Sequence, residues 1–176
     1  MSKQETPVLY FNLSEGAILP TYKTKGSSGF DLHANLVLKP QLYGDTFNSR
    51  NPKNPTENSI ILKPNGRALI KTGLKPMNIP DGYEIQIRPR SGVSLQKGLL
   101  FPNSIGTIDN DYRGDMGIIV SNHTKERIVI RHGDRIAQGV LCPIMQVSII
   151  DGTNITDVKF EETERGENGF GSTGNE

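Results

Sequence analysis

Residues 80–92 read PDGYEIQIRPRSG, and this stretch indicates the fold class of the chain. Apolar and polar side chains alternate through its middle, which is the period of two expected for a strand with one buried face. The turn Pro80-Asp81-Gly82 precedes that strand, since proline fixes φ and glycine accepts a positive φ. The alternating residues are Tyr83, Ile85 and Ile87 on one face and Glu84, Gln86 and Arg88 on the other.

Similar short runs of strand-forming residues recur along the rest of the chain, with turn residues between them. No window has a sustained helical period, and only Val93–Lys97 is suited to about one or two helical turns. Many short strands are typical of a β-sandwich or jelly roll. We therefore predict an all-β, jelly-roll-like barrel or sandwich with at most one short helix. The other predicted strands are Val8–Leu13, Phe30–Leu38, Ser59–Leu62, Ala68–Leu74, Gly117–Ser121, Arg127–Arg131 and Ile136–Ile144.

The composition limits the classes of partner and the cellular compartment. A chain of 176 residues suits one domain. A formal net charge of +1 gives no general electrostatic attraction to nucleic acid or to an anionic membrane, so neither is expected as a partner. The single cysteine, Cys142, excludes an intrachain disulfide, and the N-terminal stretch lacks the apolar run of a signal peptide. We expect a cytoplasmic protein, or one inside the nucleus or a host cell.

Residues 41–58, QLYGDTFNSRNPKNPTEN, differ from the strand runs on either side. The segment is rich in Asn, Pro and other polar residues and offers no continuous core face, so it reads as an exposed insertion. A few ordered residues are expected around Leu42-Tyr43 and Phe47. A protein partner at this insertion is one hypothesis that the sequence leaves open.

The densest cluster of polar residues is GTIDNDYRGD, Gly106–Asp115. Its acidic residues resemble the start of a calcium-binding loop, but Arg113 stands at the fifth position and Val120 at the twelfth, where a bidentate Glu is needed. A calcium loop is therefore excluded. The segment is instead interpreted as the tip of a β-hairpin that carries Asp109 and Tyr112, and a solvated turn remains the alternative.

Three other stretches contain polar groups that could contact a ligand or a metal ion. The first of them suits a phosphate oxygen. RPRSGVS, residues 88–94, offers Arg90, Ser91 and the amide of Gly92 at a strand end. GDRIAQGVLCPI, residues 133–144, has Gln138 within an apolar strand, where it must bind either a structural partner or a ligand. GSSGFDLHA, residues 26–34, contains Asp31, which is either paired, with Arg135 as a reasonable partner, or directed at the hydration shell of a metal ion.

Taken in order, five motifs between about Ser28 and Gly174 make the sequence resemble the trimeric, all-β dUTPases (deoxyuridine 5′-triphosphate nucleotidohydrolases). The resemblance implies a homotrimer with active sites shared between subunits. It also implies hydrolysis of dUTP to dUMP and pyrophosphate with Mg²⁺, which limits uracil incorporation into DNA and supplies dUMP. The motifs are SGFDL, PRSG, GTIDNDYRGD, GDRIAQ and RGENGFGSTG.

The same resemblance implies a role for each matching residue. Asp109 would orient and activate the attacking water, and Tyr112 would pack beneath the deoxyribose. Asn103, with the backbone of Gly106 and Ile108, would recognise uracil. Asp31 would act on Mg²⁺ through water. The residues implied to contact the phosphates or form the site around them are Arg90, Ser91, Gly92 and Gln138.

The last motif lies in ERGENGFGSTG, residues 164–174, and it resembles the glycine-rich arm that closes over bound nucleotide in this family. Phe170 would stack on uracil, with Gly171 beside it, and Arg165, Ser172 and Thr173 would bind the terminal phosphates. We therefore predict a β domain over residues 1–163 with a polar insertion at about 41–58, followed by a flexible arm over 164–176.

Some positions depart from the usual motifs, and two other functions remain open. Ser28 and Phe30 replace the usual Ala and Tyr of the first motif, and Asn168 stands where the fifth motif often has Gly. The related dCTP deaminases use a catalytic Glu, but between Tyr83 and Ser121 the sequence offers only Glu84. A trimeric binding or regulatory protein that acts through the insertion is the other alternative.

Overall fold

The computed structural model describes residues 6–51, 53–156, 162–164 and 166–167. The chain divides into two units, one ending at Met145 and the other beginning at Gln146. The strands of the described residues lie in the first unit and pair in antiparallel fashion, so the all-β prediction is confirmed. The compact unit ends before residue 163, where the sequence placed the end of the β domain.

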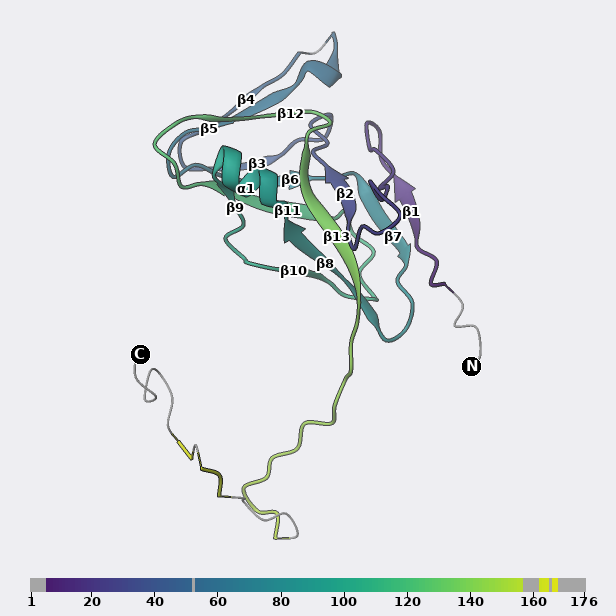
Figure 1. Ribbon diagram of the computed structural model, residues 1–176. Coiled ribbons are helices and arrows are strands. Elements are labelled where there is room, and N and C mark those ends of the chain that lie inside the picture. The colour runs from purple at the N-terminus through teal and green to yellow at the C-terminus, as the bar shows by residue number, and fades with distance from the viewer. Residues whose placement is uncertain (1–5, 52, 157–161, 165, 168–176) are drawn as a thin grey trace. The chain divides into compact units, whose positions relative to one another are not determined.

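Two four-stranded sheets form the framework of the candidate site, since their strands carry Asp31, Gly106, Ile108 and Gln138 (Figure 1). The first sheet has the order β10 (Gly106–Ile108), β8 (Tyr83–Pro89), β13 (Arg135–Pro143) and β2 (Phe30–His33). The second has the order β3 (Gln41–Tyr43), β6 (Arg67–Lys71), β11 (Gly117–Asn122) and β9 (Leu99–Leu100).

Two smaller sheets complete the described part of this unit. One is three-stranded, with the order β12 (Ile128–Arg131), β5 (Ser59–Leu62) and β4 (Thr46–Ser49), and the other pairs β1 (Tyr10–Leu13) with β7 (Leu74–Asn78).

The alternation seen in the sequence of β8 matches the burial of its side chains. Ile85 and Ile87 are fully or almost fully buried, whereas Glu84, Gln86 and Arg88 are half-buried on the opposite face. The buried face joins one apolar core that includes Leu32, Ile60, Ile70, Ile118 and Ile130. Burial of this alternating face stabilises the sheet and leaves the other face of β8 free for polar chemistry.

The short helix predicted after Pro89 is present as α1 (Ser91–Lys97). It ends at Gly98, which has a φ of 64° and caps the helix by donating its amide to the carbonyl of Ser94. This left-handed conformation favours glycine. A 3₁₀ turn, η1 (Pro55–Glu57), is the other helical element of the described residues.

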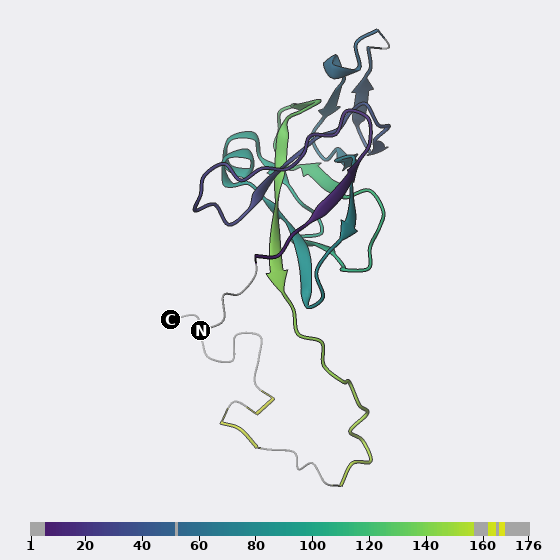
Figure 2. The same cartoon turned by 90° about the vertical axis from the view of Figure 1, so that its right-hand side faces the viewer.

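The polar segment 41–58 is part of two sheets. β3 pairs with β6 and β4 pairs with β5, which confirms the ordered residues expected near Leu42-Tyr43 and Phe47. Figure 2 shows β4 and β5 side by side at the upper end of this unit. The polar composition concealed these strands because strand pairing uses backbone hydrogen bonds, which do not depend on an apolar side-chain face.

Two sequence predictions of strand geometry are corrected. The run Ala68–Leu74 divides at Gly73, whose φ of 77° ends β6 and allows β7 to begin at Leu74. The predicted hairpin around Asp109 is wrong, because β10 pairs with β8 whereas β11 pairs with β6 and β9. Residues 109–116 therefore connect two different sheets.

In the parts of the chain that the structure describes, no helix has the length and apolarity needed to cross a bilayer.

Candidate active site

Asp31, on β2, lies between two arginines. Its Oδ1 is 3.0 Å from Nε of Arg90, and its Oδ2 is 3.0 Å from Nη1 of Arg135. Arg90 also donates from Nη1 to the carbonyl of Arg135, at 3.1 Å. The Asp31 side chain is only 12% exposed, so both oxygens of a largely buried carboxylate are charge-paired. The predicted Arg135 partner is confirmed, and Arg90 is a second partner that the sequence did not indicate.

Gln138 belongs to the same part of the first sheet. Its Cα is opposite Asp31 on one side and opposite Arg88 on the other. Its Nε2 donates to the carbonyl of Pro89 at 2.9 Å, so the amide has the structural partner that a polar group in this strand requires. A side chain at Gly29 would overlap Oε1 of Gln138, which explains the glycine there.

Arg90, Ser91 and Gly92 lie at the junction between β8 and α1. Arg90 is the residue before the helix, and Ser91 and Gly92 are exposed in its first turn. Gly92 is exposed, and apart from its chain neighbours and the helix backbone nothing lies within 4 Å of the position that a Cβ there would take, so this side of the residue is open to a ligand. The structure therefore places Asp31, Gln138 and the predicted phosphate-binding residues of the second motif in one cluster, which we call the arginine cluster.

His33 lies on β2, two residues after Asp31, and its Cα is opposite Arg135. Burial lowers the pKa of His33, Asp31 opposes that shift, and Arg135 and Arg90 add to it. Its Nδ1 is buried without a hydrogen-bond partner among the described residues. Burial and the two arginines therefore favour the neutral form of the imidazole beside the arginine cluster.

Asp109 and Tyr112 lie in the loop between β10 and β11, which we call the 109–116 loop. The amide of Tyr112 donates to the carbonyl of Asp109 at 3.1 Å, which forms a tight turn. The Asp109 side chain is exposed. The Tyr112 hydroxyl donates to the carbonyl of Asp115 at 3.0 Å, so the phenol is fixed at its tip while 40% of the residue stays exposed. This arrangement can present a carboxylate and an aromatic face to a ligand.

Asn103 and Gly106 lie together just before that loop. A Cβ on Gly106 would be 3.3 Å from Nδ2 of Asn103 and 3.3 Å from Cβ of Ile87, so the asparagine side chain lies over the glycine. Gly106 is half-buried in β10, and Ile108 is buried at its end. The amide side chain of Asn103 and the backbone of β10 are thus close enough to bind one small planar ligand.

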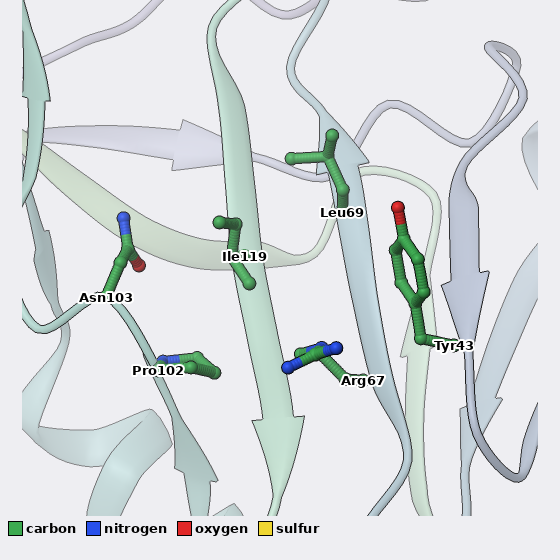
Figure 3. A pocket seen from close by; sticks show the side chains of 6 residues that line it. All are labelled: Tyr43, Arg67, Leu69, Pro102, Asn103 and Ile119. Atoms are coloured by element: carbon green, nitrogen blue, oxygen red, sulfur yellow. The ribbon is translucent and has the colours of Figure 1, made fainter.

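Asn103 also lines a cavity of about 390 Å³ that the sequence did not indicate. Figure 3 shows Ile119 of β11 between Asn103 and Pro102 on one side and Leu69, Arg67 and Tyr43 on the other. The guanidinium of Arg67 lies 5.3 Å from the centre of the Tyr43 ring, within the range of a cation–π contact. Tyr43 comes from the segment predicted as an insertion, so no motif pointed to this cavity.

The arginine cluster and the 109–116 loop are at opposite ends of β8. Ile108 is opposite Ile85, and the arginine cluster begins at Arg90, five residues further along. At about 3.3 Å per residue, this separation is about 16 Å along the strand. A single chain therefore does not bring Asp109 and Arg90 around one phosphorus atom.

The side chains of the candidate site limit how a metal ion could bind there. Among the described residues no group of three or more His, Cys, Asp or Glu side chains could hold a metal ion. Asp31 is already paired through both oxygens, so it fits an outer-sphere role through water better than a direct bond. A metal ion at this site would take most of its ligands from water and from a bound ligand, and Asp31 would contact it through water.

The predicted roles of the arm residues stay predictions, because these residues lie outside the part of the chain that the structure describes. They are Arg165, Phe170, Gly171, Ser172 and Thr173.

Comparison with known proteins gives one consistent family. A model of the dUTPase family matches residues 56–174. The chain is 41% identical to the deoxyuridine 5′-triphosphate nucleotidohydrolase of Dinoroseobacter shibae, over 91% of this chain and 90% of that protein. It is 44% identical to the protein of the same name from Roseobacter denitrificans, over 89% and 86% of the two chains. Its fold is similar to a solved mutant of the Staphylococcus bacteriophage 80alpha dUTPase with dUpNHpp, with a TM-score of 0.68 and 26% identity over 96% and 99% of the two chains.

Proposed function

Because this chain belongs to the dUTPase family, we propose that it is a deoxyuridine 5′-triphosphate nucleotidohydrolase that splits dUTP into dUMP and pyrophosphate. The roles that we propose for the residues rest on one observation, which is that the candidate site is divided between the two ends of β8. One end offers the Asp109 carboxylate and the Tyr112 ring, and the other offers arginines and exposed backbone donors. The Asn103 amide lies between them, over Gly106 and opposite Ile87 of β8. These are the groups that recognition of a nucleoside and of a triphosphate require.

The nucleoside end performs recognition and prepares the nucleophile. Asn103 and the backbone of Gly106 and Ile108 bind the uracil edge, and the Tyr112 ring packs against the deoxyribose, where it leaves no room for a 2′-hydroxyl. Asp109 accepts a hydrogen bond from a water molecule and takes its proton as the water oxygen bonds to the α-phosphorus. The bond from that phosphorus to the bridging oxygen breaks, and pyrophosphate leaves.

The arginine cluster holds the triphosphate. Arg90 supplies positive charge, and Ser91 and the amide of Gly92 supply neutral donors to phosphate oxygens. Asp31 fixes the orientation of Arg90, and Gln138 supports the backbone at Pro89. Mg²⁺, when bound with the triphosphate, neutralises part of its negative charge. The C-terminal arm closes over the nucleotide through Arg165, Phe170, Gly171, Ser172 and Thr173.

We infer a homotrimer in which the arginine cluster of one copy faces the 109–116 loop of the next. Two observations support assembly. The catalytic groups are too far apart in one chain, and two large apolar side chains that directly follow β13 are exposed in the first unit. Exposed apolar groups of this size are typical of protein interfaces. They are Ile144 and Met145, which are 38% and 89% exposed.

The decisive experiment measures pyrophosphate release from dUTP with Mg²⁺, with UTP, dTTP and dCTP in parallel, for the wild-type protein and for Asp109→Asn. The wild type should hydrolyse dUTP alone. The variant should lose about 10²–10⁴-fold in kcat, the range expected for a lost general base, while it still binds a non-hydrolysable analogue of dUTP.

Two outcomes would contradict the proposal. Equal hydrolysis of all four nucleotides would remove the uracil and deoxyribose roles of Asn103 and Tyr112. Release of ammonia from dCTP would favour a deaminase, although the carboxylate of Glu84 already accepts a hydrogen bond from Gln86 at 2.7 Å within β8.

A further inference from the structure

We propose that Asp115 positions the ring of Tyr112 and thereby helps the enzyme to distinguish deoxyribose from ribose. This inference rests on the proposed function, because that function places the Tyr112 ring against the sugar. Asp115 itself need not touch the substrate, so we describe it as a positioning residue.

The first link joins Tyr112 to the backbone of Asp115. The phenol hydroxyl donates to the Asp115 carbonyl at 3.0 Å. Gly114 lies under the ring, where any Cβ would overlap the hydroxyl and the ring carbon that bears it. The position of the ring therefore follows the position of residues 114 and 115.

The second link joins Asp115 to the core. Its Oδ1 accepts a hydrogen bond from the amide of Gly73 at 3.1 Å. Met116, the next residue, is fully buried, and its amide donates to the carbonyl of Leu74 at 2.9 Å. Asp115 therefore lies directly before the residue at which the loop is hydrogen-bonded to β7 and leads into β11.

The point to which Asp115 is attached is itself rigid. Gly73 is buried with a φ of 77°, and a Cβ there would overlap the side chains of Asn35 and Ala17. Asn35 is only 2% exposed, and its backbone amide donates to the carbonyl of Lys71 at 2.9 Å. A close-packed turn of this kind moves little, so it can fix a loop that is otherwise exposed.

The attachment needs an acceptor oxygen rather than a negative charge. Asp115 is half-buried, and burial raises the pKa of its carboxyl group, whereas the hydrogen bond from Gly73 and the nearby Lys71 and Lys75 lower it. An asparagine at this position keeps an oxygen that can accept from Gly73. Asp115→Asn is therefore the conservative variant, and Asp115→Ala removes the acceptor.

The chain offers a matched control on the same loop. Asn110 donates from Nδ2 to Oδ1 of Asp81 over 3.4 Å at an exposed position. This contact also ties the 109–116 loop to a neighbouring turn, but it is long and accessible to water. Asn110→Ala tests whether any loss of a loop contact has the same effect.

The experiment compares kcat/KM for dUTP and for UTP in these variants. Asp115→Ala should lower the ratio of dUTP to UTP by about tenfold, chiefly through a higher KM for dUTP. Asp115→Asn and Asn110→Ala should keep the ratio within about twofold of the wild type. Tyr112→Phe, which removes only the donor hydroxyl, should also lower the ratio. This variant can replace Asp115→Ala in the test if Asp115→Ala does not fold.

A double variant shows whether Asp115 acts through Tyr112. In a Tyr112→Ala background, Asp115→Ala should cause no further change in the ratio, because the two residues belong to one unit. An unchanged ratio in Asp115→Ala or in Tyr112→Phe, with the wild type selective for dUTP, would overturn this inference and leave the proposed function intact. A wild type that does not prefer dUTP to UTP would overturn the proposed function instead.

Discussion

Asp31 and Arg90 form an ion pair of 3.0 Å between Oδ1 and Nε, although Asp31 lies on β2 and Arg90 directly follows β8, which is not a neighbour of β2 in the first sheet. The strand between them is β13, which supplies Arg135 for the second oxygen of the carboxylate. One acidic residue therefore orients two arginines that face the predicted triphosphate site.

Asp31→Asn should weaken both the fold and phosphate binding. The substitution removes the charge from a side chain that is 12% exposed and leaves Arg90 and Arg135 without their anionic partner. We expect the free energy of unfolding to fall by about 1–3 kcal/mol and KM for dUTP to rise. Urea denaturation and steady-state kinetics measure the two effects. Asp45→Asn is the control, because its pair with Lys63 is 3.9 Å long and exposed, and it should change stability by less than about 0.5 kcal/mol.

Two inactive variants should restore activity when their subunits are mixed. Asp109→Asn damages the 109–116 loop and Arg90→Ala damages the arginine cluster, and the two lie at opposite ends of β8. If each site takes one end from each of two copies, random mixed trimers regain intact sites, up to about a quarter of the total in a 1:1 mixture. The measurement is dUTP hydrolysis after joint unfolding and refolding of the two variants. Activity no higher than that of the separate variants would show that one chain supplies both ends.

Gly114→Ala should reduce the preference for dUTP without unfolding the protein. The added methyl group would overlap the hydroxyl end of the Tyr112 ring and force the ring to move. We expect about a tenfold loss in kcat/KM for dUTP and a smaller change for UTP. Gly26→Ala is the matched control, because nothing lies within 4 Å of its added Cβ. Equal kinetics for the two variants would mean that the ring position is not critical.

The protein should become less stable as the pH falls below about 6.5, in part through His132. Burial lowers the pKa of His132 below its ordinary value of 6.5, and its Nδ1 accepts a hydrogen bond from the amide of Leu36 at 3.2 Å. Because the unfolded chain binds the proton more readily, the contribution of neutral His132 to the stability of the fold is fully present above the pKa of this histidine in the unfolded chain. It is lost as the pH falls through the lower folded pKa.

His132→Asn tests this pH dependence, because the asparagine oxygen can still accept from Leu36 but does not titrate. The change in melting temperature between pH 7 and pH 5.5 should be smaller in this variant than in the wild type. His33 should retain part of the effect, since burial lowers its pKa in the same direction. His123→Asn, at an exposed position, is the control. A variant with the same pH dependence as the wild type would exclude His132 as a cause.

The sequence by itself determined the fold class and the family, and it supplied the candidate residues of the site. Alternation over Tyr83–Arg88 predicted β8, and the run Ser59–Leu62 matches β5 at both ends. These signals are local, because alternate side chains of any strand face opposite sides whatever the strand pairs with. The order of the five motifs identified the family for the same reason, since it depends only on residue types and their order.

The tertiary structure alone decided how these residues are combined. The pairing of Asp31 with Arg90, the strands hidden in residues 41–58 and the separation of Asp109 from Arg90 along β8 all depend on which strands lie side by side. Strand order and register are set by hydrogen bonds and burial between segments far apart in the chain, so no local pattern contains them. The attachment of Asp115 to Gly73 is of this kind, because it joins the most recognisable motif to a turn that no motif marks.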